Sequence, residues 1–174
     1  MSFLLAILGD AFFAAVAGVG FGAISDPPVY AFPKIALLAA VGHAARFVLM
    51  KSGVDIATAS FAAAFIIGTG SLFLARKIKV PMTILYIPAL LPMIPGIYAY
   101  KTVFSLIMFL RTFQNPESGF MYIQSFFLNA TVSTAVVILL ATGAALPTFV
   151  FGNMSHALSR SKRGKKLWNY SGKR

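Results

Sequence analysis

The chain has 174 residues, of which 59% are hydrophobic and only 11% are charged. Ordinary soluble domains are nearer about 50% apolar and about 25% charged. One water-soluble core of this length cannot enclose so many apolar side chains, so the composition excludes an ordinary soluble enzyme and predicts a membrane protein. The net charge is +11, and the absence of cysteine excludes disulfides and thiol chemistry.

Five apolar segments succeed one another along the chain. A run of about 20 apolar residues is long enough for a helix to cross a bilayer. We therefore expect an all-α integral membrane protein with about five transmembrane helices, in a membrane domain of residues 1–155 that precedes a basic cytoplasmic tail of residues 156–174. The first segment lacks a basic leader and exceeds a signal-peptide core, so we expect it to be retained. The expected spans are residues 3–24, 32–50, 56–75, 82–110 and 124–151.

The fourth apolar segment is interrupted by proline. Pro88, Pro92 and Pro95 each remove a backbone donor, and in lipid the freed carbonyls must find another partner. We expect a discontinuous helix, with halves at residues 82–91 and 97–110 around a break at Pro92–Gly96. A re-entrant hairpin or two short spans remain as alternatives.

Basic residues set the expected orientation. The cluster at residues 76–79, the tail and Lys34 share one side of a five-span protein, and the positive-inside bias makes that side cytoplasmic. We expect a multi-pass protein of the bacterial inner membrane with its N-terminus outside and its C-terminus in the cytoplasm. The tail is expected to contact membrane lipid. No nucleic-acid partner is expected, because membrane proteins commonly end in such tails.

Three ionisable residues lie in the interior of the first two expected spans, away from Lys34 at the start of the second. Asp10 is the sole acid inside a span, and at helical spacing it shares a face with Ala14, Gly18 and Gly22, so it should face another helix. Arg46 on the second span lies at a similar depth, and His43 faces the same way. We expect Asp10 to pair with Arg46, and intramembrane ionisable groups are candidates for proton coupling. The alternative is a structural ion pair beside a packing seam. A second seam is expected at Ser60, Ala64 and Gly68.

The break also precedes an intramembrane lysine by one helical turn. Lys101 shares a helix face with Tyr98 and Ser105, and the free N–H groups at a helix start attract anions. We expect a small carboxylate-bearing substrate to bind Lys101 and the N–H groups of Gly96, Ile97 and Tyr98. Such half-helix sites recur in secondary transporters. The alternative is that Lys101 pairs with Asp10 or with an acid of a partner.

Signatures of catalysis are missing from the sequence. With two His, four acids and no Cys, it offers no paired carboxylates, no metal cluster and no phosphate loop. We expect no enzyme, no metal and no cofactor.

Three segments carry a resemblance to a known family: residues 20–28 (GFGAISDPP), 75–81 (ARKIKVP) and above all 87–98 (IPALLPMIPGIY). The chain resembles the threonine/serine exporter family, in its short type that corresponds to the C-terminal half of the fused proteins. The likeness covers about residues 3–148. It implies a larger partner subunit with its own transmembrane helices, and gradient-driven export of amino acids or, in one branch, of succinate.

Three functions are therefore compatible with the sequence. The chain is the small subunit of a two-component amino-acid exporter, the subunit of a dicarboxylate exporter, or an assembly subunit without substrate contact. A second basic group facing Lys101 would favour a dicarboxylate, because two carboxylates need two cations. A lysine that faces lipid, or is sealed in an ion pair, would favour the assembly function.

Overall fold

The structure is a computed structural model that describes residues 3–112 and 114–151. Every regular element in these residues is helical. The elements in chain order are α1 (Phe3–Ile24), the 3₁₀ turn η1 (Val29–Ala31), α2 (Phe32–Lys51), α3 (Ile56–Ile78), α4 (Thr83–Leu90), the 3₁₀ turn η2 (Leu91–Met93), α5 (Gly96–Thr112) and α6 (Pro116–Val150).

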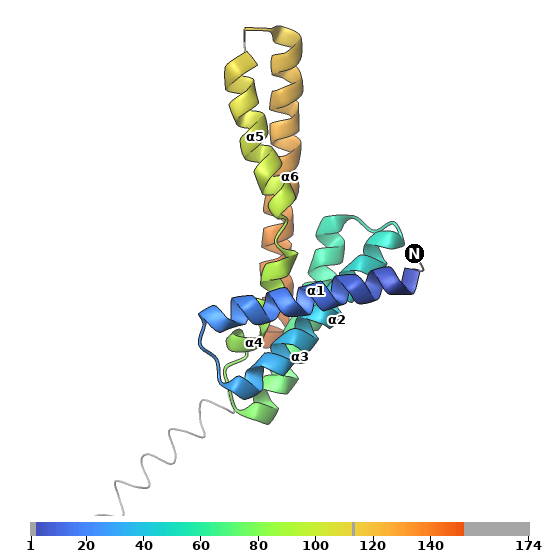
Figure 1. The fold of residues 1–174 in the computed structure, drawn as a ribbon, viewed down its shortest axis with the longest axis vertical. Helices are drawn as coiled ribbons and strands as arrows, with labels where there is room; N and C mark the ends of the chain where they lie inside the picture. Colours follow the sequence, from blue (N-terminus) through green and yellow to red (C-terminus); the bar gives the residue numbers. More distant parts are fainter. Residues whose placement is uncertain (1–2, 113, 152–174) are drawn as a thin grey trace, which may run out of the picture.

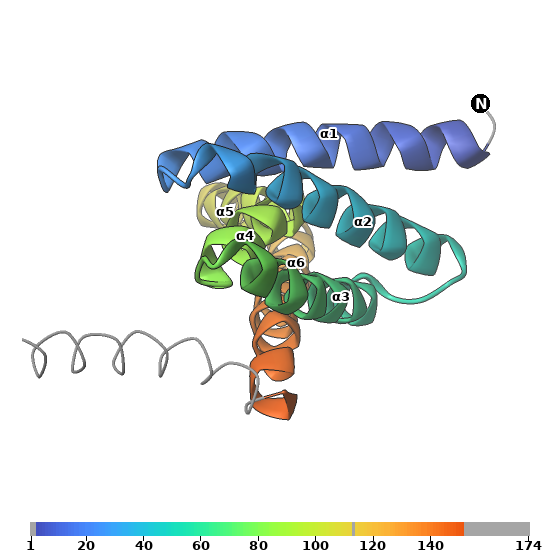
Figure 2. The same cartoon turned by 90° about the horizontal axis from the view of Figure 1, so that it is seen from below.

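The helices form a body and a projecting arm. α1, α2 and α3 lie side by side in that order, and α4 is held against all three (Figures 1 and 2). α5 and α6 pair along their length and stand out from the body (Figure 1). We call this α5–α6 pair the arm. The C-terminal half of α6 continues into the body and packs on α3.

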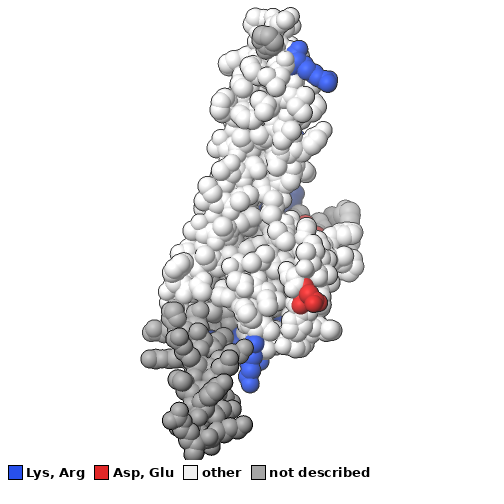
Figure 3. Space-filling view, turned by 90° about the vertical axis from the view of Figure 1, so that its left-hand side faces the viewer, with Lys and Arg blue, Asp and Glu red and all other residues white. Residues whose placement is uncertain are grey.

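The fold class expected from the sequence is confirmed. Four helical stretches are long and apolar enough to cross a membrane: α1, η1 with α2, α3, and α6. α4–η2 and α5 together make a fifth candidate, bent by 52° at a short break. On the face drawn in Figure 3, uncharged residues cover almost the whole length of the arm. The chain is thus a multi-pass all-α membrane protein with one discontinuous helix.

Local sequence explains where the helices begin. The Asp55 side chain accepts a hydrogen bond of 2.8 Å from the Thr58 N–H and caps α3. Hydrogen bonds from the side chain and backbone of Thr58 lower the pKa of the Asp55 carboxyl. A lowered pKa means that the cap stabilises α3 at neutral pH and is lost in acid, as the pH falls below the carboxyl's ordinary value of 3.8.

The last helix begins earlier than expected. α6 starts at Pro116, eight residues before the expected span of residues 124–151. Asn115 caps the helix by accepting from the Ser118 N–H, Pro116 fills the first turn, and Glu117 complements the helix dipole. The basic tail expected at residues 156–174 lies outside the described residues.

The body is held together by small residues at helix crossings. Ser60, Ala64 and Gly68 are buried on α3, as expected for a packing seam. A Cβ added at Gly68 would lie 2.6 Å from the Ala144 carbonyl oxygen of α6, and one at Gly143 would lie 2.6 Å from the Phe61 carbonyl oxygen. Both glycines therefore let α3 and α6 approach backbone to backbone.

Candidate functional site at the helix break

The break between α4 and α5 is built by proline. α4 ends at Leu90, the turn Leu91–Met93 follows, and Ile94 is extended before α5 starts at Gly96. Pro92 and Pro95 have no N–H to continue the helical ladder. Part of the break is satisfied locally, because the Ile94 N–H donates to the Leu91 carbonyl at 3.2 Å. The Met93 carbonyl is left to a side chain from another helix.

That side chain is Arg46 of α2. Its Nη1 donates a hydrogen bond of 2.8 Å to the Met93 carbonyl oxygen. The guanidinium also lies within electrostatic reach of the Asp10 carboxylate and of the Tyr98 hydroxyl. Arg46 therefore bonds α2 to the break and lies within electrostatic reach of α1 and of the first turn of α5. Sequence reasoning placed Arg46 on the second span but did not link it to the break.

Asp10 has a different partner from the one expected. Its Oδ2 lies 2.9 Å from Nδ1 of His43, and that pair, rather than Asp10 with Arg46, is the short contact in the structure. The expected pairing of Asp10 with Arg46 stays a prediction: no hydrogen bond joins them among the described residues, although Asp10 acts electrostatically on Arg46. His43 and Arg46 are three residues apart on one face of α2, so the crossing of α1 over α2 decides which of them meets the carboxylate.

Small residues bring α1 close to the break, as the sequence predicted. Ala14, Gly18 and Gly22 are buried along the same face of α1 as Asp10. A Cβ added at Gly18 would lie 2.9 Å from the Ala39 Cβ of α2 and 3.6 Å from the Pro88 carbonyl oxygen of α4. Residue 92 is proline and cannot donate to that carbonyl, so α1 packs directly over a weakened part of the ladder.

The start of α5 offers fewer free donors than expected. The Gly96 N–H donates to the Ile94 carbonyl at 2.8 Å, and the Tyr98 N–H donates to the Pro95 carbonyl at 3.1 Å. Within the described residues, Ile97 is the one of the three whose N–H has no backbone acceptor. Gly96 is not explained by strain either, because its φ is not positive and a Cβ there would meet nothing within 4 Å.

The three side chains expected on one face of α5 are not brought into one enclosed site. Ser105 is buried, Tyr98 is half-buried and Lys101 is exposed on the arm. Tyr98 and Lys101 are three residues apart and so lie on neighbouring positions of one helix face. Arg46, Tyr98 and Lys101 therefore follow one another from the body onto the arm, whereas Ser105 packs inward.

A hollow on α6 has no charged side chain that could bind the carboxylate or ammonium group of a substrate. It is shallow, about 430 Å³ in volume, and its polar lining is two threonines. Its lining residues on α6 are Ala130, Thr131, Thr134, Ala135 and Ile138. In the part of the chain that the structure describes, no three His, Cys, Asp or Glu residues gather to hold a metal ion. The break with Asp10, His43, Arg46 and Tyr98 is therefore the candidate site.

Several apolar helices, one of them broken beside intramembrane charges, define a multi-pass membrane protein of the transporter class. The family described as Threonine/Serine exporter, ThrE matches residues 10–150, so the chain belongs to the threonine/serine exporter family.

We also compared the chain with curated relatives and with solved structures. An uncharacterized protein of Haemophilus influenzae is 32% identical over 149 residues, which cover 86% of this chain and 49% of that protein. The chain thus spans about half the length of this curated relative. No solved structure matches the chain.

Proposed function

We propose that the chain is the small membrane subunit of a two-component exporter that moves threonine, serine or a similar amino acid out of the bacterial cytoplasm. The observation that carries this proposal is the Arg46 hydrogen bond to the Met93 carbonyl at the helix break. A cation with one hydrogen bond from its five N–H donors among the described residues thus lies beside a half-helix start, in a protein of an exporter family. An amino-acid carboxylate matches that arrangement, because a guanidinium binds carboxylates in a bidentate manner.

In this proposal the other expected binding residues have separate roles beside that of Arg46. The substrate carboxylate meets Arg46 and the Ile97 N–H, and Tyr98 borders the same region. Lys101, one turn farther along α5, guides the carboxylate toward the break or meets an acid of the partner. Gly96 keeps the approach to the helix start open, since nothing lies within 4 Å of where its Cβ would be. Ser105 is assigned to packing of the arm rather than to the substrate.

A larger partner subunit completes this exporter in our proposal. The arm carries exposed apolar side chains at Ile97, Val103, Leu110, Phe120 and Phe127. α6 has 35 residues and is about 52 Å long at 1.5 Å per residue, whereas the hydrocarbon core is about 30 Å thick. A second membrane protein that covers the arm would shield both the surplus apolar length and Lys101. The relative of about twice the matched length is consistent with a missing half.

A dicarboxylate such as succinate is the second candidate substrate. The observation in its favour is that Tyr98 lies within electrostatic reach of Arg46, and Lys101 follows Tyr98 by three residues on the same helix face. A dicarboxylate would use both cations and would need no acid, whereas an amino acid would use Asp10 for its ammonium group.

Efflux assays distinguish these functions. Cells that produce the protein with its genomic neighbours intact should release preloaded labelled threonine or serine faster than cells that lack it. Faster release of succinate alone would establish the dicarboxylate function. Equal release of all three substrates with and without the protein would refute the export proposal. In proteoliposomes the purified chain alone should be inactive, and full activity of the isolated chain would exclude an obligate partner.

A further inference from the structure

In the Asp10–His43 pair, one ring nitrogen of His43 contacts Asp10 and the other has no hydrogen-bond partner among the described residues. Asp10 Oδ2 lies 2.9 Å from His43 Nδ1, while His43 Nε2 is buried and has no hydrogen-bond partner among the described residues. Imidazole is the side chain whose protonation ordinarily changes near neutral pH. Burying an ionisable pair of this kind in a membrane costs free energy, and such pairs therefore usually mark functional sites.

The charges around the pair are few and can be counted. Arg46, within electrostatic reach of Asp10, is the neighbouring cation on α2, and Tyr98 of α5 is the hydroxyl facing Arg46. With a neutral His43, the Asp10 and Arg46 charges cancel. One added proton makes the cluster positive. The other ionisable side chains on the described helices that pack here are Lys34 and Lys51 of α2, Arg76 and Lys77 of α3, Tyr86 of α4, and Tyr100, Lys101 and Arg111 of α5.

A bound amino acid and a proton on His43 compete for the Asp10 carboxylate. A zwitterionic substrate presents a carboxylate, which suits Arg46, and an ammonium group, which suits the Asp10 carboxylate. When a proton converts His43 to imidazolium, that carboxylate is neutralised by its neighbour and the ammonium group loses its partner. We infer that the Asp10–His43 pair is the site where a proton and the substrate's ammonium group replace one another. This inference rests on the proposed function.

The exchange balances as an antiport. The deprotonated pair binds the ammonium group of a cytoplasmic amino acid. At the outer face one proton forms an N–H bond at His43 Nε2 and the substrate leaves. The empty carrier then releases that proton to the cytoplasm, so one proton enters for each amino acid exported. Asp10 is suited to this exchange because about a third of its side chain, 34%, stays exposed while His43 is 17% exposed.

The hydrogen bond between Arg46 and the break links the Asp10–His43 pair to the joint between α4 and α5. Arg46 shares its face of α2 with His43 and holds the Met93 carbonyl. A proton on His43 adds a positive charge beside Asp10 and so changes the electrostatic balance at Arg46. It therefore changes the strength with which Arg46 holds the joint between α4 and α5.

Everted membrane vesicles that contain the wild-type protein and its native partner separate coupling from substrate binding. Two quantities are measured with labelled threonine or serine: exchange without a gradient, and uptake driven by an acidic lumen. We expect His43→Gln to retain exchange and to lose gradient-driven accumulation, because Gln still donates to Asp10 but cannot take up a proton. Asp10→Asn should lose coupling and also raise the half-saturation concentration for exchange by about ten- to hundred-fold.

Lys34→Gln is the matched control, since it removes a charge from the far end of α2 and should change neither quantity. Retained exchange also shows that each variant folds. Gradient-driven accumulation by His43→Gln at the wild-type level would overturn the proton site and leave the exporter proposal standing. Wild-type vesicles that neither exchange nor accumulate either amino acid, compared with vesicles lacking the protein, would instead overturn the proposed function.

Discussion

Arg46 spends one of its five N–H donors on a backbone carbonyl that the helix break leaves without a helical donor. The other donors of a membrane-embedded guanidinium still need acceptors, because an unpaired charge in lipid costs about 2.5–3.5 kcal/mol on insertion scales. Asp10 supplies part of that need electrostatically, and a substrate carboxylate can supply more. The same side chain thus stabilises the bend and leaves binding capacity at it.

A double-mutant cycle tests the pairing seen in the structure. Asp10→Asn and His43→Gln should be non-additive in free energy of unfolding, measured by denaturation in mixed micelles. Hydrogen bonds between membrane helices couple by about 0.6 kcal/mol on average and at most about 1.7 kcal/mol. The Asp10 and Arg46 cycle should show weaker coupling, because no short contact joins them. Additive effects of Asp10 and His43 would show that the pair does not form.

For single residues, the sequence predicts which side chains face another helix, but it does not predict which atoms form hydrogen bonds. Helical spacing identified the small-residue face of Asp10 and placed His43 and Arg46 together on α2. Their partners depend on the angle at which α1 crosses α2 and on where the break lies in space. Both are tertiary features that spacing along one helix does not contain. The prolines indicate carbonyls without a helical donor at Pro88 and Leu91, four residues before Pro92 and Pro95, so they do not identify the Met93 carbonyl as the one that Arg46 binds.

The elements follow local signals closely where those signals are strong. Paired prolines after α1, the Asp55 cap before α3 and the proline-rich break all lie where the chain changes direction. The expected span of residues 124–151 leaves out the first turns of α6, because those turns are polar. Asn115, Pro116 and Glu117 together are the helix-start signal that corrects this boundary.

The α3–α6 seam gives a stability prediction. Gly68→Ala should lower the free energy of unfolding by about 1–3 kcal/mol, because the added methyl meets a backbone oxygen that cannot move aside. Gly20→Ala on α1 is the control, since nothing lies within 4 Å of its Cβ, and it should change stability by less than about 1 kcal/mol. Equal effects in mixed-micelle denaturation would mean that α3 and α6 do not pack in this way.

The break gives a transport prediction. Pro95→Ala combined with Gly96→Ala should straighten the joint between α4 and α5 and lower substrate efflux, although Arg46 and Lys101 are unchanged. Pro33→Ala, in the first turn of α2 where proline is compatible with a helix, should leave efflux unchanged. Wild-type efflux in the doubly substituted protein, at matched membrane abundance, would show that the bend is not needed.

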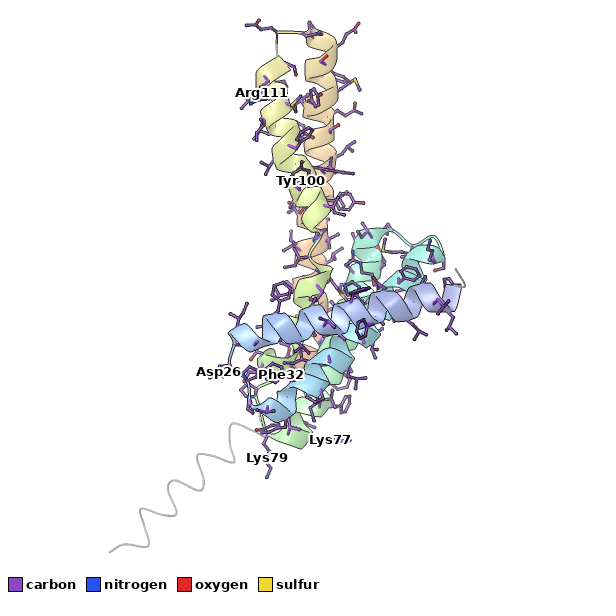
Figure 4. All side chains as sticks on the ribbon, viewed as in Figure 1. Asp26, Phe32, Lys77, Lys79, Tyr100 and Arg111 are labelled. Atoms are coloured by element: carbon purple, nitrogen blue, oxygen red, sulfur yellow. The ribbon has the colours of Figure 1, made fainter. Side chains whose placement is uncertain are left out.

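At the scale of the whole molecule, the charged residues labelled in Figure 4 lie toward two opposite ends. Asp26, Lys77 and Lys79 lie near one end of the molecule, and Arg111 lies near the tip of the arm at the other end (Figure 4). This arrangement agrees with a shared side for the first and third turns between helices. The arm itself was not foreseeable from hydropathy, because the projection of α5 and α6 depends on the bend of 52°.

Reporter fusions test the orientation. Fusions at Lys79 and Lys166 should both report a cytoplasmic location, because basic segments are retained on the cytoplasmic side. A fusion at Gly53, in the turn between α2 and α3, should report an outside location. A signal from outside the cytoplasm at Lys79 or at Lys166 would contradict the proposed topology.

The central claim is that the helix break with its cations binds the carboxylate of an exported substrate. Efflux of labelled threonine or serine should be measured in cells that produce Arg46→Gln, Arg46→Lys and Lys101→Met at matched membrane abundance. Arg46→Gln should weaken substrate binding by about 1.5–3 kcal/mol, the range for a hydrogen bond to a charged group, with Arg46→Lys less affected. Lys101→Met should weaken it less than Arg46→Gln. Wild-type efflux from both Arg46→Gln and Lys101→Met at all substrate concentrations would contradict the claim and place the binding site on the partner.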